Sequence, residues 1–456
     1  MKKSMSSFMG MLILIILVLS LFVLPACSKA SVMPTTSAPP ASSAPAAPAT
    51  STTSAAPKVS VTTTAPAAPS TTTVASTTAT AELKTLKIGY IDNFAFSSGV
   101  DVIHIMDIYN EMYKEQGGLD IGGEKYQIQF VSYDNQNSQS VAMAALNKLI
   151  FEDKVKYITT GFTPLSDGWL PVTEANKVVF VDGGVTPPIY DPKYNYCFEA
   201  GCLPCQATAG PFLFVKMFPD VKDVVMCSPD TQMGHVGSTD ASAIQRANGL
   251  TVKEIFYPAS SSDLSSLGTQ VAKLNPPVCC CQGGGPLVDS LAQKAIYAAG
   301  WRGVFFTAPP STALNMQQVT PPEVMEGQIV GAIPCEFDPP LTDAAKDFKA
   351  RWIAKYDKYE GQTLGNMQWD AIRCAMQATG STDVDKVAAA LHNGLQYSGA
   401  GGDCQMVPRM DFGDSRTTGS ACKIYLKKIV KGQPTLIGTM SLEDAVAVMN
   451  KYYVKK

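Results

Sequence analysis

Cysteine is the residue type in this sequence with the most obvious capacity for chemistry, because twelve cysteines occur among the 456 residues. Three of them, Cys197, Cys202 and Cys205, fall within the stretch NYCFEAGCLPC. The C-L-P-C part opens a predicted helix, where a thiolate would be stabilised. The pattern fits a redox dithiol, a disulfide that pins a crossing of the chain, or plain small buried residues. An isolated C-x-x-C is a weak signal, which favours the two structural interpretations.

A second cysteine-rich stretch, PPVCCCQGGGPL, is predicted to be a buried strand that ends in a glycine turn. Side chains alternate along a strand, so Cys279 and Cys281 share one face while Cys280 points to the other. Three adjacent thiols on one strand therefore cannot converge on a single tetrahedral metal ion without outside ligands. Small apolar packing is expected for the first two. The last one, with Gln282 and Gly283, is expected to line a pocket where glycine lets the backbone approach a ligand.

Acid–base or metal chemistry usually involves histidine, and this chain has three: His104, His235 and His392. His104 and His392 fall in different predicted helices, so a histidine cluster for a metal or a catalytic triad is not expected. The sequence also lacks a G-x-S-x-G elbow, a phosphate loop with a lysine, and a G-x-G-x-x-G after a strand. We therefore expect a protein that is not an enzyme and that needs no metal or cofactor.

The N-terminal residues have the order of an export signal, expected to span residues 1–26. Lys2 and Lys3 precede an apolar run of about 16 residues, which is short for a membrane span of ~20. The sequence LPAC, ending at Cys27, resembles the lipobox of bacterial lipoproteins, in which the cysteine is lipidated and becomes the mature N-terminus. An uncleaved anchor is the alternative. Either would hold the exported chain at the outer face of the cytoplasmic membrane, at the cell surface or in the periplasm.

A low-complexity segment follows. Residues 28–81 are almost wholly Ser, Thr, Ala, Pro and Val, so they cannot bury enough surface to offset the entropy of ordering. Residues 27–84 are thus expected to be the lipidated cysteine and a disordered stalk. A net charge of −3 without a basic run argues against nucleic acid as a partner. Lipidation of Cys27 would leave eleven cysteines, an odd number, so at least one thiol has no partner within the monomer.

From about residue 85 onward, short apolar strands alternate with helical patterns. TLKIGYIDNF, for example, is followed by Val102, Ile105 and Tyr109 at helical spacing. Such alternation predicts an α/β fold with mostly parallel sheets, and because it occurs twice we expect two doubly wound, Rossmann-like lobes. Ligands of such sheets bind beyond the carboxyl ends of the strands. Those ends are DNFAFSSG, GFTPLSDG, DGGVT, SPDTQMGH, CCCQGGG and TAPPST.

The order of these motifs is similar to that of the substrate-binding proteins of branched-chain amino acid type ABC transporters. The better markers are QGGLDIGGEKYQI and the WDAI helix at residues 369–372. The resemblance covers about residues 86–425 and implies the type I periplasmic binding protein fold, with two lobes joined by three crossovers. It places the crossovers near residues 199–203, 331–335 and 405–410. Lobe 1 would comprise residues 85–202 and 334–406, and lobe 2 residues 203–333 and 407–456.

The resemblance also implies where a ligand is held in the first lobe. There the family holds carboxylate-like groups with hydroxyls and backbone amides at a helix N-terminus, which suits an anion. The matching residues are Thr163, Ser166 and Asp167, the last through its backbone amide together with that of Gly168. A helix cap is the alternative role for Ser166.

The next strand end of the first lobe matches family pocket residues at Gly184 and Thr186. In the second lobe the chain departs from amino acid binders, because Met233 stands where those proteins have a tyrosine. Pro310 and its neighbours likewise stand where the family has an acidic residue that holds the ligand's ammonium.

An ammonium without a carboxylate in a closed site would cost several kcal/mol. Either Asp182 or Asp230 therefore takes that role, or the ligand is not an α-amino acid. Phe94 and Phe96 in the first loop favour an apolar or aromatic carboxylate or amide.

Taken together, the resemblance implies a monomeric solute-binding lipoprotein of an ABC importer. It would capture a small molecule, an amino acid or a related compound, between its lobes and deliver it to the membrane permease without covalent chemistry. Two alternatives stay open. One is a thiol redox or metal-binding surface protein that uses Cys197, Cys202 and Cys205, and the other is a ligand-sensing receptor module.

Overall fold

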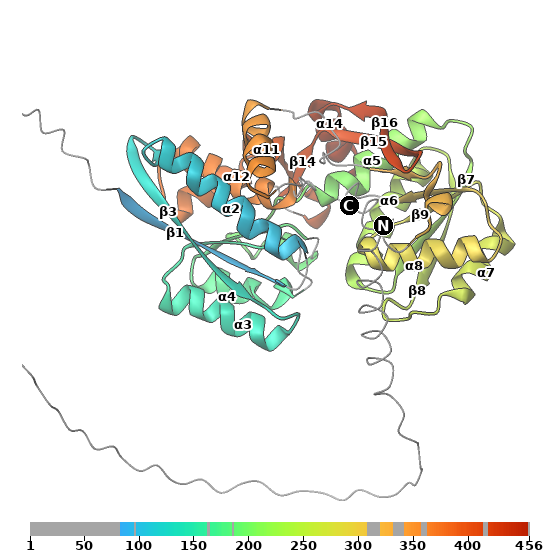
Figure 1. Ribbon diagram of the computed structural model, residues 1–456, viewed down its shortest axis with the longest axis horizontal. Coiled ribbons are helices and arrows are strands. Elements are labelled where there is room, and N and C mark those ends of the chain that lie inside the picture. The colour runs from blue at the N-terminus through green and yellow to red at the C-terminus, as the bar shows by residue number, and fades with distance from the viewer. Residues whose placement is uncertain are drawn as a thin grey trace, which may run out of the picture. The chain divides into compact units, whose positions relative to one another are not determined.

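The computed structural model describes residues 83–94, 97–161, 165–184, 187–307, 320–331, 342–356, 363–413 and 418–454. Two helix-covered sheets form two lobes, and a smaller third sheet completes the fold (Figure 1). This confirms the expected α/β architecture of two doubly wound lobes. The expected signal peptide, Cys27 and nearly all of the stalk lie outside the described residues. Within them no helix combines the length and the apolar character that crossing a membrane requires.

Lobe 1 is built on a six-stranded sheet in the order β2-β3-β1-β4-β5-β6. Neighbouring strands run parallel, except that β2 and β3 form an antiparallel pair. Because β1 lies between β3 and β4, the direction of winding reverses at β1, and its carboxyl end is a topological switch point where ligands bind in such folds. The strands are β1 (Lys84–Asp92), β2 (Leu119–Ile121), β3 (Glu124–Asp134), β4 (Tyr157–Thr159), β5 (Val179–Asp182) and β6 (Cys197–Glu199).

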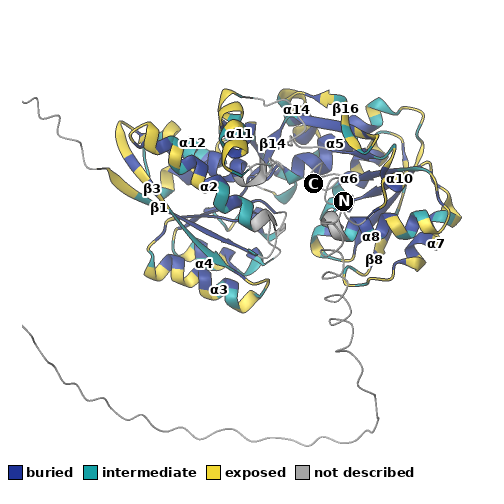
Figure 2. Cartoon of the chain, viewed as in Figure 1, coloured by how far each residue is buried: buried dark blue, intermediate teal, exposed yellow. Residues whose placement is uncertain are grey.

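Helices cover both faces of this sheet, and the alternation of side chains along β1 shows how. Tyr90 packs in the core formed with α2 and α12, whereas the next residue, Ile91, packs in the core formed with α3 and α4. Buried strands thus lie between helices whose outer faces are exposed (Figure 2). The helices are α2 (Ser97–Glu115), α3 (Gln139–Asn147), η1 (Lys148–Glu152), η2 (Ser166–Gly168), α4 (Leu170–Ala175), η3 (Pro187–Tyr190), α11 (Asp343–Tyr356), α12 (Thr363–Thr379) and α13 (Val384–His392).

Lobe 2 is built on a seven-stranded sheet in the order β16-β15-β11-β10-β9-β7-β8. The five strands from β11 to β8 are parallel, and β15 and β16 add an antiparallel edge. Here the switch point lies between β7 and β9. The strands are β7 (Asp223–Pro229), β8 (Thr251–Tyr257), β9 (Val278–Cys281), β10 (Val304–Thr307), β11 (Ile329–Val330), β15 (Ile424–Val430) and β16 (Gln433–Met440).

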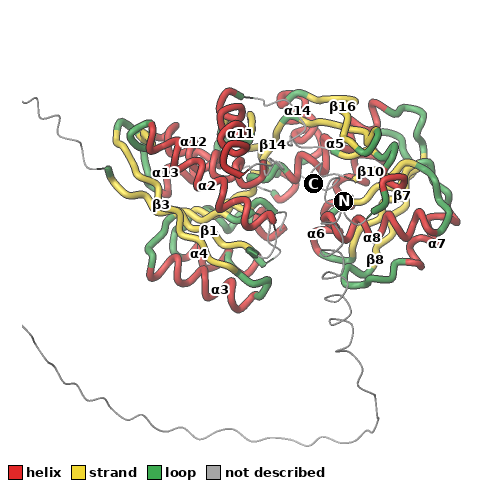
Figure 3. The backbone as a smooth tube through the Cα atoms, in the orientation of Figure 1, coloured by secondary structure: helices red, strands yellow, loops and turns green. Residues whose placement is uncertain are grey.

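The cysteine strand β9 separates the two cores of lobe 2 as its alternation predicts. Cys280 packs in the core with α5 and α6, while Cys279 and Cys281 pack in the core with α7 and α8. The prediction that Cys280 faces away from its two neighbours is therefore confirmed. Figure 3 shows the resulting layers of helices on both sides of the strands. The helices are α5 (Leu203–Met217), α6 (Gln232–Ala247), α7 (Ser265–Leu274), α8 (Gly285–Ala298), α10 (Pro322–Met325) and α14 (Leu442–Tyr452).

The third sheet lies where the chain crosses between the lobes. It has three antiparallel strands, β12 (Gln396–Gly399), β13 (Gly402–Pro408) and β14 (Thr418–Cys422), and β14 contacts both β6 of lobe 1 and α5 of lobe 2. The first crossing leaves β6 and enters α5. The lobe boundaries drawn from the resemblance remain a prediction.

Glu199, the last residue of β6, holds this first crossing in place. Its buried carboxylate accepts hydrogen bonds from the backbone amides of Gly201 (2.6 Å) and Leu203 (3.3 Å). It also accepts bonds from the amide (2.9 Å) and hydroxyl (3.1 Å) of Ser420 on β14. Burial raises the pKa of Glu199 to about 8, although the three amides favour the charged form.

Arg409, just after β13, is a second point where the two lobes meet. Its buried guanidinium donates two hydrogen bonds to Asp411 (2.8 and 2.9 Å) and lies 3.7 Å from Asp240 on α6. Aromatic rings surround it, including Tyr190 of lobe 1 at 4.5 Å and Tyr453 at 3.7 Å. The third crossing is thus fixed by a buried charge that contacts both lobes.

Candidate ligand-binding site

The carboxyl end of β1 carries a buried carboxylate at the switch point of lobe 1. The carboxylate of Asp92 accepts hydrogen bonds from the Tyr90 hydroxyl (2.9 Å), the Asn93 amide (2.7 Å) and the Gly161 amide (3.0 Å). Because Gly161 follows β4, Asp92 joins the ends of two neighbouring strands. A Cβ atom at Gly161 would lie 2.6 Å from Asp92 Oδ2, so this approach needs glycine.

A second buried carboxylate ends β5. Asp182 accepts hydrogen bonds from the Ser166 hydroxyl (2.7 Å) and from the Gly184 amide (2.8 Å). Burial raises the pKa of Asp182 to about 6, and the negative charge of Asp92 acts in the same direction. The strand ends of lobe 1 therefore concentrate hydrogen-bond acceptors and negative charge.

The structure brings together the described residues that the resemblance placed in the first-lobe site. Ser166 and Asp167 lie in η2, and Ser166 and Gly184 both donate to Asp182. The hydroxyl of Ser166 donates to this carboxylate, and the residue that caps α4 is Trp169. The Ser166 hydroxyl, expected as a donor to a ligand carboxylate, is thus already bound to a carboxylate of the protein, as is the amide of the predicted pocket residue Gly184.

Phe94 adds an apolar surface to the same strand end. Its ring stacks on that of Tyr90, with centroids 6.2 Å apart and planes 10° from parallel, and it is half-buried. Four other predicted site residues lie outside the described residues: Phe96, Thr163, Thr186 and Pro310.

In lobe 2 the predicted residues Met233, Gln282 and Gly283 lie side by side at the switch point between β7 and β9. Gly283 has φ +80°, and a Cβ atom there would lie 2.8 Å from Gly234 Cα and 3.0 Å from the Met233 carbonyl oxygen. The loop after β9 therefore packs tightly on the first turn of α6. Glycine is required at Gly283 for both its conformation and this contact.

Gln282 has an unusual environment in this loop. Its side chain is 5% exposed, and its amide Nε2 is buried without a hydrogen-bond partner among the described residues. Leaving a buried donor unpaired costs about 1–3 kcal/mol. A ligand oxygen that accepts from Nε2 would remove this cost, so Gln282 is the strongest candidate for ligand contact in lobe 2.

The side chain of Cys281 was expected to line the pocket but lies in the core of lobe 2 instead. Its thiol donates to Asp289 Oδ1 (2.9 Å) in the core between β9 and α8, and the Thr307 hydroxyl donates to Asp289 Oδ2 (3.1 Å). Burial raises the pKa of Asp289 to about 6. A ligand at this strand end would therefore meet only the backbone of Cys281.

The two acids considered as partners of a ligand ammonium differ in environment. Asp230 follows β7, its side chain is 68% exposed, and it pairs with His235 Nε2 at 2.7 Å. Asp182 is fully buried. A carboxylate in a low-dielectric site attracts a cation more strongly than one in water, which favours Asp182.

Sequence reasoning missed three polar side chains at or near this region. Asp92 ends β1 and Thr160 directly follows β4, and polarity at a strand end is the signal that would have found them. The Thr160 hydroxyl and both amide atoms of Gln206 on α5 are buried without hydrogen-bond partners among the described residues. Nothing in the sequence around Gln206 distinguishes it from an ordinary helical residue.

The predicted cluster of Cys197, Cys202 and Cys205 separates in the structure. Cys197 packs in the lobe 1 core with α4, where its sulfur lies 3.3 Å from the Thr173 hydroxyl and burial raises its pKa to about 12. Cys202 and Cys205 belong to the other core. Among the described residues, no group of three or more His, Cys, Asp or Glu side chains is arranged to hold a metal ion.

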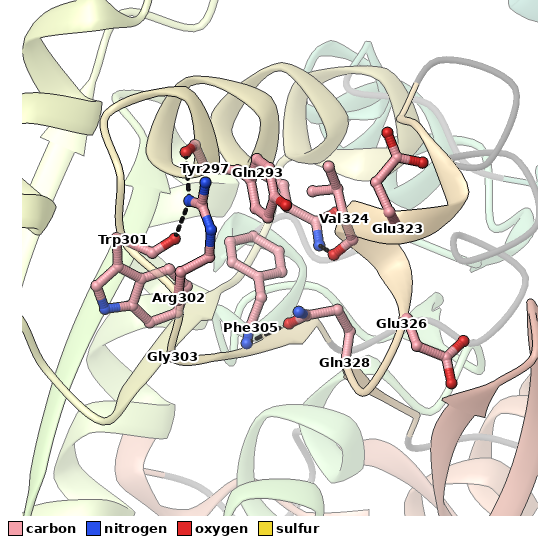
Figure 4. Close-up of a pocket in the computed structure, with 10 residues that line it drawn as sticks. All are labelled: Gln293, Tyr297, Trp301, Arg302, Gly303, Phe305, Glu323, Val324, Glu326 and Gln328. Carbon is pink, nitrogen blue, oxygen red and sulfur yellow. Dashed lines mark hydrogen bonds between the residues drawn. The ribbon is translucent and has the colours of Figure 1, made fainter.

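A small cavity of about 160 Å³ lies at the opposite edge of lobe 2 (Figure 4). It is lined by α8, the loop before β10, α10 and the residues before β11. Arg302 closes part of it, donating to the carbonyl oxygens of Tyr297 (2.7 Å) and Trp301 (2.8 Å). Because the amino ends of parallel strands meet there, this cavity is separate from the strand-end site.

Comparison with known proteins identifies the class to which this arrangement belongs. A family model described as periplasmic binding protein matches residues 85–419, so the chain belongs to that family. The family consists of non-enzymatic binding proteins that act outside the cytoplasm, which confirms the prediction of a binding protein rather than an enzyme. No curated protein sequence matches the chain.

Solved structures share the fold at low sequence identity. The leucine binding protein LivK from Thermotoga maritima has TM-score 0.64 and 18% identity, over 79% of this chain and 99% of that one. A solute binding protein of an ABC transporter from Rhodopseudomonas palustris, in complex with 3,4-dihydroxybenzoic acid, has TM-score 0.61 and 17% identity over 78% and 98%. LivJ from Streptococcus pneumoniae, in complex with isoleucine, has TM-score 0.61 and 14% identity over 78% and 99%. These likenesses support the two-lobed fold.

Proposed function

We propose that this protein is the solute-binding subunit of an ABC importer. It captures one small molecule between its lobes, as a monomer, and presents the closed form to the membrane permease. Lipid on Cys27 and the stalk of residues 27–84 hold it at the outer face of the cytoplasmic membrane. Family membership and the polar groups at the strand ends of each lobe support this function.

The observation that carries the ligand assignment is the difference in polarity between the two strand-end sites. In lobe 1 the donors of Ser166 and Gly184 are bound to Asp182, and Asp92 adds a second negative charge. A ligand carboxylate placed there would be repelled, while an N–H group or an ammonium would be attracted.

Lobe 2 offers the complementary group. The Nε2 of Gln282 is buried without an acceptor among the described residues, and a ligand carbonyl or carboxylate would supply one. The ligand thus points its nitrogen toward lobe 1 and its oxygen toward lobe 2. This is the reverse of the orientation that the family resemblance implies.

An amino acid or an apolar or aromatic amide has both a nitrogen for lobe 1 and an oxygen for lobe 2. A simple carboxylic acid has only the oxygen. The half-buried ring of Phe94 provides an apolar surface beside Asp92. The relatives bound to isoleucine and to 3,4-dihydroxybenzoic acid support ligands of this size. Closure of the lobes would exclude water and strengthen both polar contacts.

Matched pairs of ligands test this proposal by thermal shift. Leucine is compared with 4-methylpentanoate, and benzamide with benzoate, each over a concentration series. We expect a saturable rise in melting temperature that is larger for the nitrogen-bearing member of a pair. If no compound shifts the melting temperature, small-molecule capture is wrong; if the acids bind more tightly, the orientation is wrong.

A pair of glutamine variants identifies the lobe 2 contact. Gln282→Ala should weaken binding of the best ligand about tenfold, because one hydrogen bond to a buried donor is lost. The control is Gln270→Ala, an exposed glutamine on α7. Equal affinities for the two variants would remove Gln282 from the site.

The anchor is tested separately in a bacterial host. Cys27→Ser should release the protein from the membrane fraction without changing ligand affinity, because the substitution removes the lipid attachment atom. Retention of the variant in membranes would indicate an uncleaved anchor instead.

A further inference from the structure

The cavity at the amino ends of the lobe 2 strands contains groups that the proposed function does not use, and we call it the edge cavity (Figure 4). Its walls come from α8, α10, the loop before β10 and the residue before β11. Its volume of about 160 Å³ equals that of about five water molecules, since each takes up ~30 Å³ of the liquid. A compact molecule with a few carbon atoms would fill it.

Gln293 on α8 brings a buried acceptor to the edge cavity. Its side chain is 3% exposed, and its Nε2 donates to the carbonyl oxygen of Val324 on α10 (3.2 Å). This bond fixes which amide atom is the nitrogen, and the other atom, Oε1, is buried without a hydrogen-bond partner among the described residues. Figure 4 shows the side chain reaching from α8 between Tyr297 and Val324. A ligand N–H group would remove the cost of this unpaired acceptor.

Three donor groups around the edge cavity are engaged within the protein. The Trp301 indole Nε1 donates to the Pro276 carbonyl oxygen (2.8 Å), and the Phe305 amide donates to Gln328 Oε1. Nη1 of Arg302 donates to two backbone carbonyl oxygens. Because Gln293 Oε1 is the atom left over, the ligand has to supply the donor.

The charges around the edge cavity favour a cation. The exposed carboxylates of Glu323 and Glu326 belong to its lining, and the C-terminal end of α8, the negative end of the helix dipole, lies beside it. Arg302 is the one cation among the described lining residues, and its guanidinium lies 3.6 Å from the centre of the Tyr297 ring. An anion would therefore be repelled by two carboxylates and a helix end, while a cation would be attracted.

Aromatic rings supply the apolar part of the wall. Tyr297, Trp301 and Phe305 line the cavity, and the last two are buried. A Cβ atom at Gly303 would lie 2.4 Å from the Trp301 ring and 2.7 Å from the Pro277 carbonyl oxygen, so glycine is needed for the indole to take this place. Aromatic rings pack against hydrocarbon and attract cations through their faces. The ligand should therefore carry an alkyl chain next to its positive charge.

We propose that the edge cavity is a second ligand-binding site, which takes a small primary alkylammonium ion. The ammonium group donates to Gln293 Oε1 and lies on the side of the Glu323 carboxylate, and the alkyl chain packs against Trp301 and Phe305. A molecule of this size binds with a dissociation constant on the order of 1 mM at best. The bound ion would join α8 to α10.

The edge cavity is distinct from the strand-end site of lobe 2, although α8 runs between them. The helix begins at Gly285, just after Gln282 and Gly283, and Gln293 lies about 12 Å further along its axis. A small ion in the cavity would not touch the strand-end residues. Either proposal can thus fail while the other stands.

Butylammonium and tetramethylammonium are the matched probes. They have the same carbon and nitrogen atoms and the same charge, but only butylammonium has N–H donors. Binding to the full chain is followed by the methyl resonances of Val324 in protein labelled at valine methyl groups, at constant ionic strength. The Val324→Ile variant identifies these resonances by their loss.

We expect the Val324 shifts to saturate with butylammonium, and tetramethylammonium to bind about fivefold more weakly, because it cannot make the hydrogen bond to Oε1. Equal dissociation constants for the two cations would overturn the proposal. The absence of a saturable shift with butylammonium would overturn it as well.

Variants assign the donor and the charge. Gln293→Leu should abolish the preference for butylammonium, whereas the same change at Gln270, an exposed glutamine on α7, should keep it. Glu323→Gln, a surface change that leaves the fold intact, should weaken binding of both cations about twofold. Gln282→Ala should leave the Val324 shifts unchanged. A preference that survives Gln293→Leu, or that is lost in Gln282→Ala, would overturn the assignment to the edge cavity.

Discussion

Asp182 in lobe 1 and Asp289 in lobe 2 are the same kind of group used in two different ways. Both are fully buried, and burial raises the pKa of each to about 6. Asp182 binds a loop amide and the hydroxyl of Ser166 at a strand end, whereas Asp289 binds a thiol and a hydroxyl on two strands beneath α8. The first shapes the candidate site, and the second fixes a helix on a sheet.

The two lobes differ in the polar groups that they present at their strand ends. In lobe 1 the strand-end donors of Ser166 and Gly184 are bound to the carboxylate of Asp182, so this lobe presents negative charge. Lobe 2 pairs its buried carboxylate within the core, and among the described residues the Nε2 of Gln282 has no partner at the strand end. Opposite polarity on the two sides is what a small molecule with a nitrogen at one end and an oxygen at the other requires.

The largest expected effect comes from the residue that contacts both lobes. Arg409→Ala should lower the free energy of unfolding by about 5 kcal/mol, because it leaves the carboxylates of Asp411 and Asp240 without their buried cation. Urea denaturation followed by circular dichroism measures this loss. The control Arg302→Ala removes an exposed arginine and should cost far less. Similar losses for the two variants would show that Arg409 does not couple the lobes.

The second-largest loss of stability is expected at Asp92, the carboxylate at the switch point of lobe 1. Asp92→Ala should cost about 4 kcal/mol, since it orphans three donors in a buried site. Asp230→Ala in lobe 2 removes an exposed, paired acid and should change stability by about 0.5 kcal/mol at most. Comparable losses of stability for the two variants would show that the buried and the exposed strand-end acids do not differ in their structural role.

The two buried aspartates also predict a pH dependence. A raised folded-state pKa means that their contribution to stability is fully present below the ordinary value near 3.8 and is lost as the pH rises through about 6. Each aspartate should therefore remove about 3 kcal/mol between pH 4 and 7. Asp182→Asn and Asp289→Asn should each flatten the curve of unfolding free energy against pH by that amount. An unchanged curve would show that the aspartate is charged in the folded protein throughout.

The smallest change in stability is expected from a substitution in the apolar surface of lobe 1. Phe94→Leu removes the stacked ring pair with Tyr90 and should cost about 1 kcal/mol of stability. Affinity for an aromatic amide should fall more than affinity for leucine, as titration calorimetry can measure. Equal losses for both ligands would mean that the ring supports the loop and does not contact the ligand.

Much of the fold could be predicted from the sequence because its signals are local. Strand alternation placed Cys280 opposite its neighbours, and the repeated strand–helix pattern gave two lobes. The candidate site was predictable to the level of strand ends, where Ser166 and Gly184 lie together. Their shared partner Asp182 was not predictable as such, because which donor meets which acceptor depends on packing between segments.

The cysteines near the first crossing show the limit most clearly. Local spacing grouped Cys197 with Cys202 and Cys205, but β6 places Cys197 in a different core. The Cys205 thiol instead contacts β14, where the Cys422 carbonyl oxygen lies 3.6 Å from its sulfur. Neither spacing nor composition carries that information, because it arises from how the third sheet docks on α5.

Hydrogen exchange with the best ligand of the thermal-shift series tests most directly whether one molecule contacts both lobes. Peptides covering the described strand ends of lobe 1 (residues 165–184) and lobe 2 (residues 278–284) should both gain protection on binding. Their protection should saturate at the same ligand concentration. Protection confined to one lobe, or two different saturation points, would contradict capture of a single small molecule between the lobes.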